Sequence, residues 1–227
     1  MHKIANYIAL ALLLLTAGSA TVRAEEPLPA KLQKLTDEAY RAYSTRETED
    51  YFDAVQKVKA ATEFSDYQET YYRACAYEAI YMFEYVDRQK GVQLAHDIYH
   101  QAKANKSNIA MYFATFALGT IREQSGNYGL AEKSYLQTLK LKEKYLPTES
   151  AAPCYLGLCE TALHRKDYEE VKEYARKALD EPGIIPMNQI TAWSYKCLAR
   201  YNQGDSLGFE EAYKERAQLI AENGGQG

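Results

Sequence analysis

Apolar residues along the chain recur every three to four positions, the spacing that places them on one face of an α-helix. No segment shows the two-residue alternation that is typical of a half-buried β-strand. The sequence therefore predicts an all-α fold whose helices follow one another in pairs. The predicted helices span residues 28–43 and 47–63, 67–88 and 91–105, 109–124 and 128–145, 152–164 and 168–179, and 187–203 and 207–222.

The clearest pair covers residues 109–145. Gly119 has no side chain to hold two helices apart, and Gly126 and Asn127 can adopt the left-handed conformation that ends a helix. Ala131 and Tyr135 lie one turn apart on the second helix and are expected to pack back onto the first. This segment resembles the tetratricopeptide repeat (TPR), whose signature is W-x2-L-G-x2-Y followed by A-x3-F and P. The residues that carry the resemblance are Leu118, Gly119, Gly126, Tyr128, Ala131 and Tyr135.

The resemblance implies a right-handed superhelical solenoid of about five antiparallel helix pairs, a scaffold for binding that carries no chemistry of its own. It divides the chain into a degenerate N-terminal capping pair over 25–66, a repeat array over 67–222 and a flexible tail over 223–227. A narrower similarity concerns segments 51–74, 118–139 and 193–205. These look like TPR regions of exported Bacteroidetes-type proteins, some of which form the periplasmic sensing half of a histidine kinase.

Residues 1–24 have the pattern of a secretory signal peptide. A basic start precedes an apolar run over 8–15, and small residues lead to a cleavage site after Ala24. The run is short for a bilayer span, and a retained anchor is the alternative interpretation. Cleavage would leave a periplasmic or otherwise exported chain without an integral membrane segment.

The formal net charge is −4 and the chain has no long basic run, so neither nucleic acid nor an anionic membrane is predicted as a partner. No catalytic sequence motif occurs, which favours a protein that is not an enzyme. His96 and His100 share a helix face and Asp97 is adjacent, but no third ligand is obvious, and neither a metal nor a cofactor is predicted. The four cysteines are interpreted as small core residues, with disulfides as the alternative in an exported chain: Cys75, Cys154, Cys159 and Cys197.

Tyrosine is the compositional outlier, with 21 residues. By analogy with TPR arrays, aromatic and polar residues of the first helices would line a concave groove that binds a protein or peptide, as an adaptor or a sensing module. The predicted lining consists of Tyr77, Tyr81, Phe113, Phe116, Thr120, Glu123, Leu156, Glu160 and Tyr201. Core packing is the alternative role for these aromatic residues.

The alternative function is a structural or oligomerisation scaffold in a cell-envelope assembly, which would use its edge helices. An exposed aromatic groove would favour partner binding on the concave face. A buried groove with an apolar end helix would favour the assembly scaffold. The sequence does not predict the oligomeric state.

Overall fold

The computed structural model describes residues 30–63 and 66–223, and these residues form ten α-helices and one π-helical turn without any β-strand. The predicted all-α fold is confirmed. The predicted signal peptide and its cleavage site lie outside the described residues, as do residues 224–227 of the predicted tail. No helix in the described part of the chain is long and apolar enough to cross a membrane.

The helices lie close to their predicted positions, and three of them begin and end at the predicted residues: α6 (Tyr128–Tyr145), α7 (Ala152–His164) and α8 (Tyr168–Leu179). The others are α1 (Ala30–Thr45), α2 (Thr48–Thr62), α3 (Gln68–Tyr81), α4 (Arg88–Ala104), α5 (Asn108–Gln124), α9 (Pro186–Asn202) and α10 (Ser206–Glu222).

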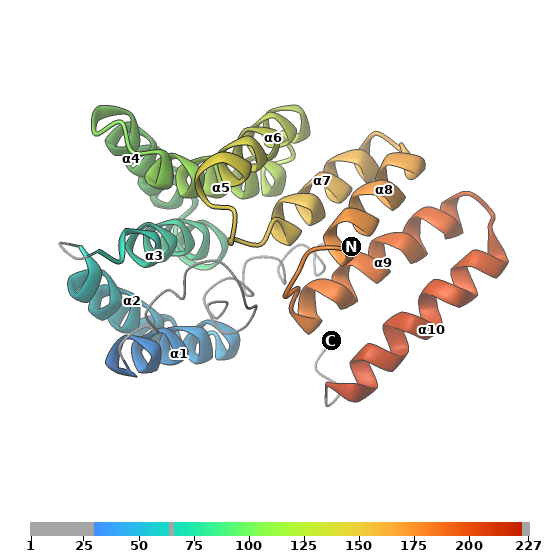
Figure 1. The fold of residues 1–227 in the computed structure, drawn as a ribbon, viewed down its shortest axis with the longest axis horizontal. Coiled ribbons are helices and arrows are strands. Elements are labelled where there is room, and N and C mark those ends of the chain that lie inside the picture. The colour runs from blue at the N-terminus through green and yellow to red at the C-terminus, as the bar shows by residue number, and fades with distance from the viewer. Residues whose placement is uncertain (1–29, 64–65, 224–227) are drawn as a thin grey trace.

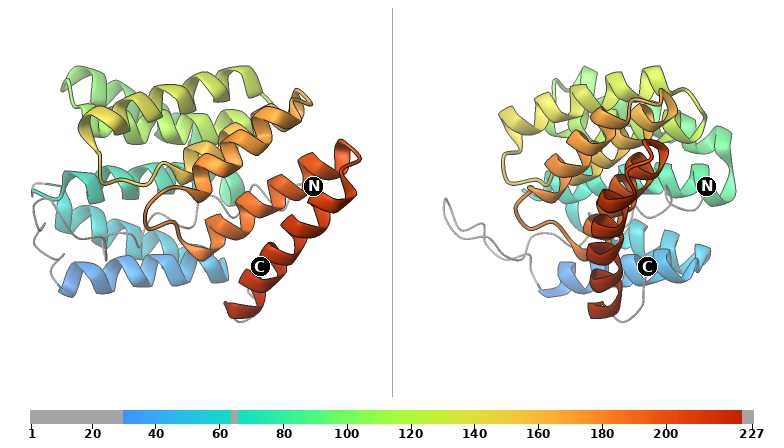
Figure 2. Two further views of the ribbon diagram at one scale, coloured as in Figure 1. Left: turned by 45° about the vertical axis from the view of Figure 1, so that its right-hand side comes forward. Right: turned by 90° about the vertical axis from the view of Figure 1, so that its right-hand side faces the viewer.

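The helices pack in consecutive pairs, α1 on α2, α3 on α4, α5 on α6, α7 on α8 and α9 on α10 (Figure 1). Each pair also contacts the next, through α2–α3, α4–α5, α6–α7 and α8–α9. The first helices α3, α5, α7 and α9 touch one another in turn. Helix α10 is the outermost helix at its end of the molecule, and the right-hand view of Figure 2 looks directly onto it.

A recurring tight turn joins the helices. The residue just before the N-cap has a positive φ in the turns that precede α2, α5, α6, α8 and α10. These residues are Arg46 (59°), Lys106 (50°), Gly126 (76°), Lys166 (60°) and Gly204 (73°). Glycine adopts this left-handed conformation without steric cost, whereas lysine and arginine do not. The predicted left-handed conformation is confirmed for Gly126 but not for Asn127, which is the N-cap of α6 and has a φ of −91°.

The predicted helix over 67–88 is helical without a break over 68–86, but its last turn is π-helical and not α-helical. Helix α3 ends at Tyr81, and a π-helical turn, η2 (Met82–Val86), leads to the N-cap of α4. The turn brings Phe83 against Gly91 at the start of α4, where an added Cβ would lie 2.5 Å from the Phe83 backbone nitrogen. In this pair the glycine that permits close approach therefore lies on the second helix, not on the first.

The buried apolar residues form two clusters. The larger one joins α1 through α6 and the start of α7, and the smaller one joins α7, α8 and α9. Helix α10 contributes to neither cluster, and its buried residues are the small Gly208 and Ala212. Among the described residues, the last helix is therefore covered on one side only, by α9.

Candidate interaction surface

Most of the predicted groove residues lie in the core. Tyr77, Tyr81, Phe113, Phe116 and Leu156 are at most 1% exposed, and Thr120 and Glu123 are also buried. Their predicted place on an open concave face is therefore wrong, because adjacent helices bury these side chains between them. Of the nine predicted residues, Glu160 is half-buried and Tyr201 is 72% exposed.

Tyrosines act as packing residues between neighbouring helices. The rings of Tyr51 in α2 and Tyr81 in α3 stack with their centroids 4.2 Å apart, and Tyr77 lies 6.1 Å from Phe116 in α5. Such aromatic pairs bury large areas with specific geometry. Core packing, the alternative role for these residues, explains much of the high tyrosine content.

Tyr135 of α6 shows how tight this packing is. Its ring lies between two glycines, Gly119 of α5 and Gly157 of α7. A Cβ added at Gly119 would lie 2.9 Å from the ring, and one added at Gly157 would lie 2.3 Å from it. The predicted close approach at Gly119 is confirmed. The Tyr135 hydroxyl donates a hydrogen bond of 2.6 Å to Oε2 of the buried Glu123, and burial raises the pKa of Glu123 to about 8.

Two more inner carboxylates have tyrosine donors. Tyr43 donates to Glu84 Oε2 at 3.1 Å, and Tyr195 donates to Glu160 Oε2 at 2.8 Å. Burial raises the pKa of Glu84, which also accepts a hydrogen bond from Gln124. Each of the three carboxyl groups thus accepts a hydrogen bond from a tyrosine hydroxyl of the same chain. Such hydrogen bonds stabilise buried polar groups.

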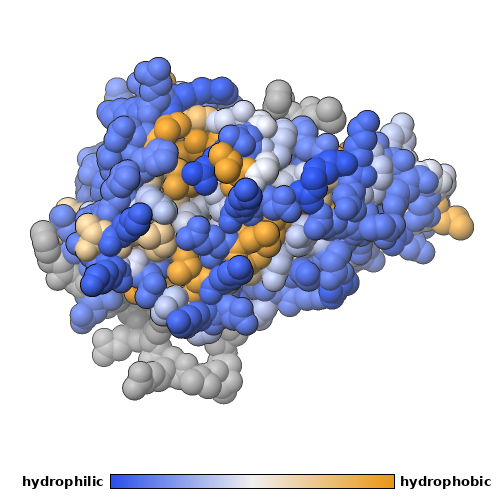
Figure 3. Space-filling view, turned by 90° about the horizontal axis from the view of Figure 1, so that it is seen from above, coloured by the Kyte–Doolittle hydropathy of each residue, from blue (hydrophilic) through white to orange (hydrophobic). Residues whose placement is uncertain are grey.

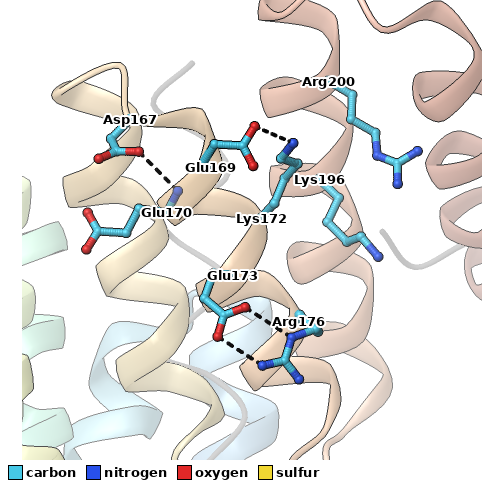
Figure 4. A pocket seen from close by; sticks show the side chains of 8 residues that line it. All are labelled: Asp167, Glu169, Glu170, Lys172, Glu173, Arg176, Lys196 and Arg200. Carbon is cyan, nitrogen blue, oxygen red and sulfur yellow. Dashed lines mark hydrogen bonds and ion pairs between the residues drawn. The ribbon is translucent and has the colours of Figure 1, made fainter.

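An open cleft of about 640 Å³ lies along α8 and α9. Figure 4 shows two ion pairs within α8 at this cleft, where Lys172 Nζ lies 2.8 Å from Glu169 and Arg176 bonds Glu173 at 2.9 Å. Exposed pairs of this kind contribute little to stability and leave few free groups for a ligand. Figure 3 shows that the part of the upper face over α8–α10 is largely hydrophilic. We interpret this cleft as a solvated helix face.

On α9 the cleft is bordered by two cations, Lys196 and Arg200. Lys196 Nζ lies 3.9 Å from the centre of the Trp193 ring, a cation–π contact. Burial and the nearby Arg200 lower the pKa of Lys196. Arg200 already contacts Glu211 of α10 at 3.3 Å, so it helps to hold the last helix in place.

The outer side of the α9–α10 pair carries an open aromatic row. Tyr201 of α9 and Tyr213 of α10 are 72% and 52% exposed, and the ring of Phe209 lies between theirs, 6.2 and 6.0 Å away. On α10, Phe209, Tyr213, Arg216 and Ile220 are spaced three or four residues apart and share one face. Arg216 Nε donates to Ser194 Oγ of α9 at 2.8 Å. We call this the end surface: Tyr201, Phe209, Tyr213, Arg216 and Ile220.

Apolar side chains also reach the surface over α4–α6, where Figure 3 shows orange patches among polar ones. The exposed apolar residues of α6 are Leu130, Leu136 and Tyr145. Their spacing of six and nine residues does not place them on one stripe of the helix. Single exposed apolar residues are common on protein surfaces, so the end surface is the stronger candidate.

The four cysteines are buried and free, which confirms them as small core residues. His96 and His100 lie near each other, with ring centres 6.3 Å apart. Among the described residues, no group of three or more His, Cys, Asp or Glu side chains is placed to hold a metal ion.

Comparison with known proteins gives no match. No protein-family model matches the chain, and no curated protein or solved structure matches it either. Function has to be inferred from the residues of this chain and their geometry.

Proposed function

We propose that this chain is an interaction scaffold, a TPR-like right-handed solenoid of five helix pairs that assembles with a protein partner through the end surface. The single observation that carries this proposal is the open row Tyr201–Phe209–Tyr213, since aromatic residues of this kind anchor protein interfaces. The consecutive packing of the pairs and the recurring left-handed turn support the TPR-like architecture.

A comparison of equivalent positions in the second helices of the five pairs supports the proposal. The N-caps are Glu47 for α2, Asp87 for α4, Asn127 for α6, Asp167 for α8 and Asp205 for α10. The fourth and eighth residues after the N-cap are buried in the first four: Tyr51 and Val55, Gly91 and Ala95, Ala131 and Tyr135, Val171 and Ala175. In α10 they are the half-buried Phe209 and the exposed Tyr213. Only the last of these helices leaves this face open.

This pattern favours the assembly scaffold over peptide binding in a concave groove. A groove needs accessible side chains, and four of the five aromatic residues predicted to line it are closed off by neighbouring helices, with Tyr201 as the exception. The end helix, in contrast, presents apolar groups to solvent, as an edge helix used in assembly would.

Two further parts of the proposal rest on the sequence. We propose that the chain works outside the cytoplasm after loss of residues 1–24, because those residues have the pattern of a signal peptide. We also propose that it works without catalysis, because it lacks a catalytic motif and the inner carboxyl groups are occupied by tyrosine hydroxyls.

A photo-crosslinking amino acid at position 213, introduced into the chain in its native host, tests the interaction surface. We expect a defined adduct, identified by mass spectrometry, that disappears when Phe209→Ser is added. The matched control carries the crosslinker at Leu130, an exposed position on α6. An adduct at position 130 equal to that at 213, or none at either position, would refute the proposed surface.

A further inference from the structure

The end surface has the form of half a helix–helix interface, and the internal interfaces indicate what completes it. Tyr135 of α6 touches Gly119 of its own pair and Gly157 of α7, the first helix of the next pair. Tyr213 has the same place in α10, eight residues after the N-cap. Cys197 stands eight residues before the α10 N-cap, as Gly119 stands eight before Asn127. The part that corresponds to Gly157 is absent from the described residues.

The internal interfaces also show which residue must come opposite. The large Tyr135 meets a glycine on the next helix. One pair later, the small Ala175 of α8 and the large Tyr195 of α9 belong to the same buried cluster. Close packing requires this exchange of large and small side chains across facing positions. The occupant of the end surface therefore needs a small residue opposite Tyr213.

Helix α10 itself supplies such a residue. The large Phe209 and Tyr213 lie in its N-terminal half, and Ala217 and Ile220 lie in its C-terminal half. We propose that a second copy of this chain occupies the end surface, with the two α10 helices antiparallel around a two-fold axis. Tyr213 of each copy then faces Ala217 of the other, and Phe209 faces the turn that holds Ile220. This inference rests on the proposed function and names its partner.

Side-chain size favours the antiparallel arrangement over a parallel one, although the antiparallel register also sets Arg216 opposite Lys214 of the other copy. Antiparallel packing brings Arg216 of one copy toward the Tyr213 ring of the other, where a cation–π contact can form. Parallel packing would instead place Tyr213 against Tyr213 and Arg216 against Arg216, with two large side chains and two like charges in contact. A two-fold interface uses the same patch on both copies. The α10 face that carries Tyr213 and Ala217 is complementary to itself only when the second helix runs in the opposite direction.

The length of α10 limits the area of the proposed dimer interface and therefore its affinity. Helix α10 has 17 residues, so it is about 25 Å long. A single seam of that length lies at the low end of protein interface sizes, so we expect a weak dimer whose population depends on concentration.

The test is sedimentation velocity of the exported, full chain over about 1 to 200 μM. We expect wild type to convert from monomer to dimer over this range. Tyr213→Ala and Ala217→Tyr should each weaken the dimer about tenfold or more, the first by a cavity and the second by collision of two tyrosines. The double variant Tyr213→Ala with Ala217→Tyr exchanges the facing residues and should restore the dimer. Leu130→Ala on α6 is the matched control and should leave it unchanged.

A wild-type chain that stays monomeric, or single variants that dimerise as wild type does, would overturn the inference. Failure of the double variant to recover, while circular dichroism shows it folded, would overturn the antiparallel register. A monomeric chain whose position 213 still crosslinks to another protein would refute the dimer but leave the proposed function standing. Absence of both dimer and crosslink would refute both.

Discussion

Helices α6 and α10 carry a tyrosine at the same position, eight residues after the N-cap, in different surroundings. Tyr135 in α6 is 1% exposed, whereas Tyr213 in α10 is 52% exposed. Both belong to a second helix that packs on the first helix of its pair. The difference is that α7 follows α6, while no described helix follows α10. Burial at this position is therefore decided by the next helix, not by the local sequence.

The comparison extends from one residue to the whole helix. Tyr135 is enclosed by two glycines and bonds a buried carboxyl group, so α6 is fixed on two sides. Helix α10 buries only Gly208 and Ala212 and contributes to neither apolar cluster. Tyr135 is thus part of the fold, whereas Tyr213 is accessible to solvent.

The largest effect should come from truncating an interior aromatic residue. Phe116→Ala should lower the free energy of unfolding by about 3 to 5 kcal/mol, because it opens a cavity between packed helices. Tyr201→Ala, at the exposed end, should change it by less than about 0.5 kcal/mol. Urea unfolding followed by circular dichroism measures both. Equal losses would remove the distinction between interior and end.

A second prediction concerns the contact between pairs. Gly157→Ala should lower the free energy of unfolding by about 1 to 3 kcal/mol, because the new Cβ collides with the Tyr135 ring. Gly129→Ala is the matched control, since a Cβ added there meets nothing within 4 Å. It should be neutral or slightly stabilising. A thermal melt in which both variants behave alike would show that Tyr135 is not enclosed as described.

The raised pKa of the buried Glu123 predicts that the free energy of unfolding depends on pH. Burial raises the pKa of Glu123 from its usual 4.5 to about 8. Between these values the folded chain keeps a proton that the unfolded chain releases, so the free energy of unfolding should fall as pH rises through this range. Glu123→Gln keeps a neutral acceptor for Tyr135 and should flatten that fall. Glu222→Gln, at an exposed site on α10, should not.

The smallest effect should come from the turns. Lys166, before α8, has a positive φ of 60°, whereas Gly204 occupies the same place before α10. Lys166→Gly should raise the free energy of unfolding by about 1 kcal/mol, because glycine removes the steric cost of the left-handed conformation. Gly204→Lys should lower it by a similar amount. Calorimetric melting of the two variants would contradict the common turn if both shifts had the same sign.

Much of the fold follows from periodicity. The 3.6-residue pattern, together with the turn at Gly126 before α6, predicted α6, α7 and α8 to the residue, because local helix signals are strong there. The π turn after Tyr81 was missed, since it depends on the contact between Phe83 and Gly91 and not on a local pattern. The glycine at position 91 was the available signal.

The site was harder to predict than the helices. Tyr81 and Phe116 carry the same apolar character whether they line a groove or fill a core, and only the neighbouring helices decide which. Tyr201 was predicted as accessible, and it is, because it belongs to the last pair. Phe209 and Tyr213 were not among the predicted surface residues, because their exposure depends on the absence of a following helix among the described residues.

The central claim is that the tyrosine eight residues after the N-cap packs in the core in α6 and contacts a partner in α10. Urea unfolding of Tyr135→Ala and Tyr213→Ala, at a concentration of about 1 μM that keeps the chain monomeric, tests it most directly. Tyr135→Ala should lower the free energy of unfolding by about 3 to 5 kcal/mol. Tyr213→Ala should lower it by less than about 0.5 kcal/mol. Losses of similar size would contradict the claim and place Tyr213 in the core.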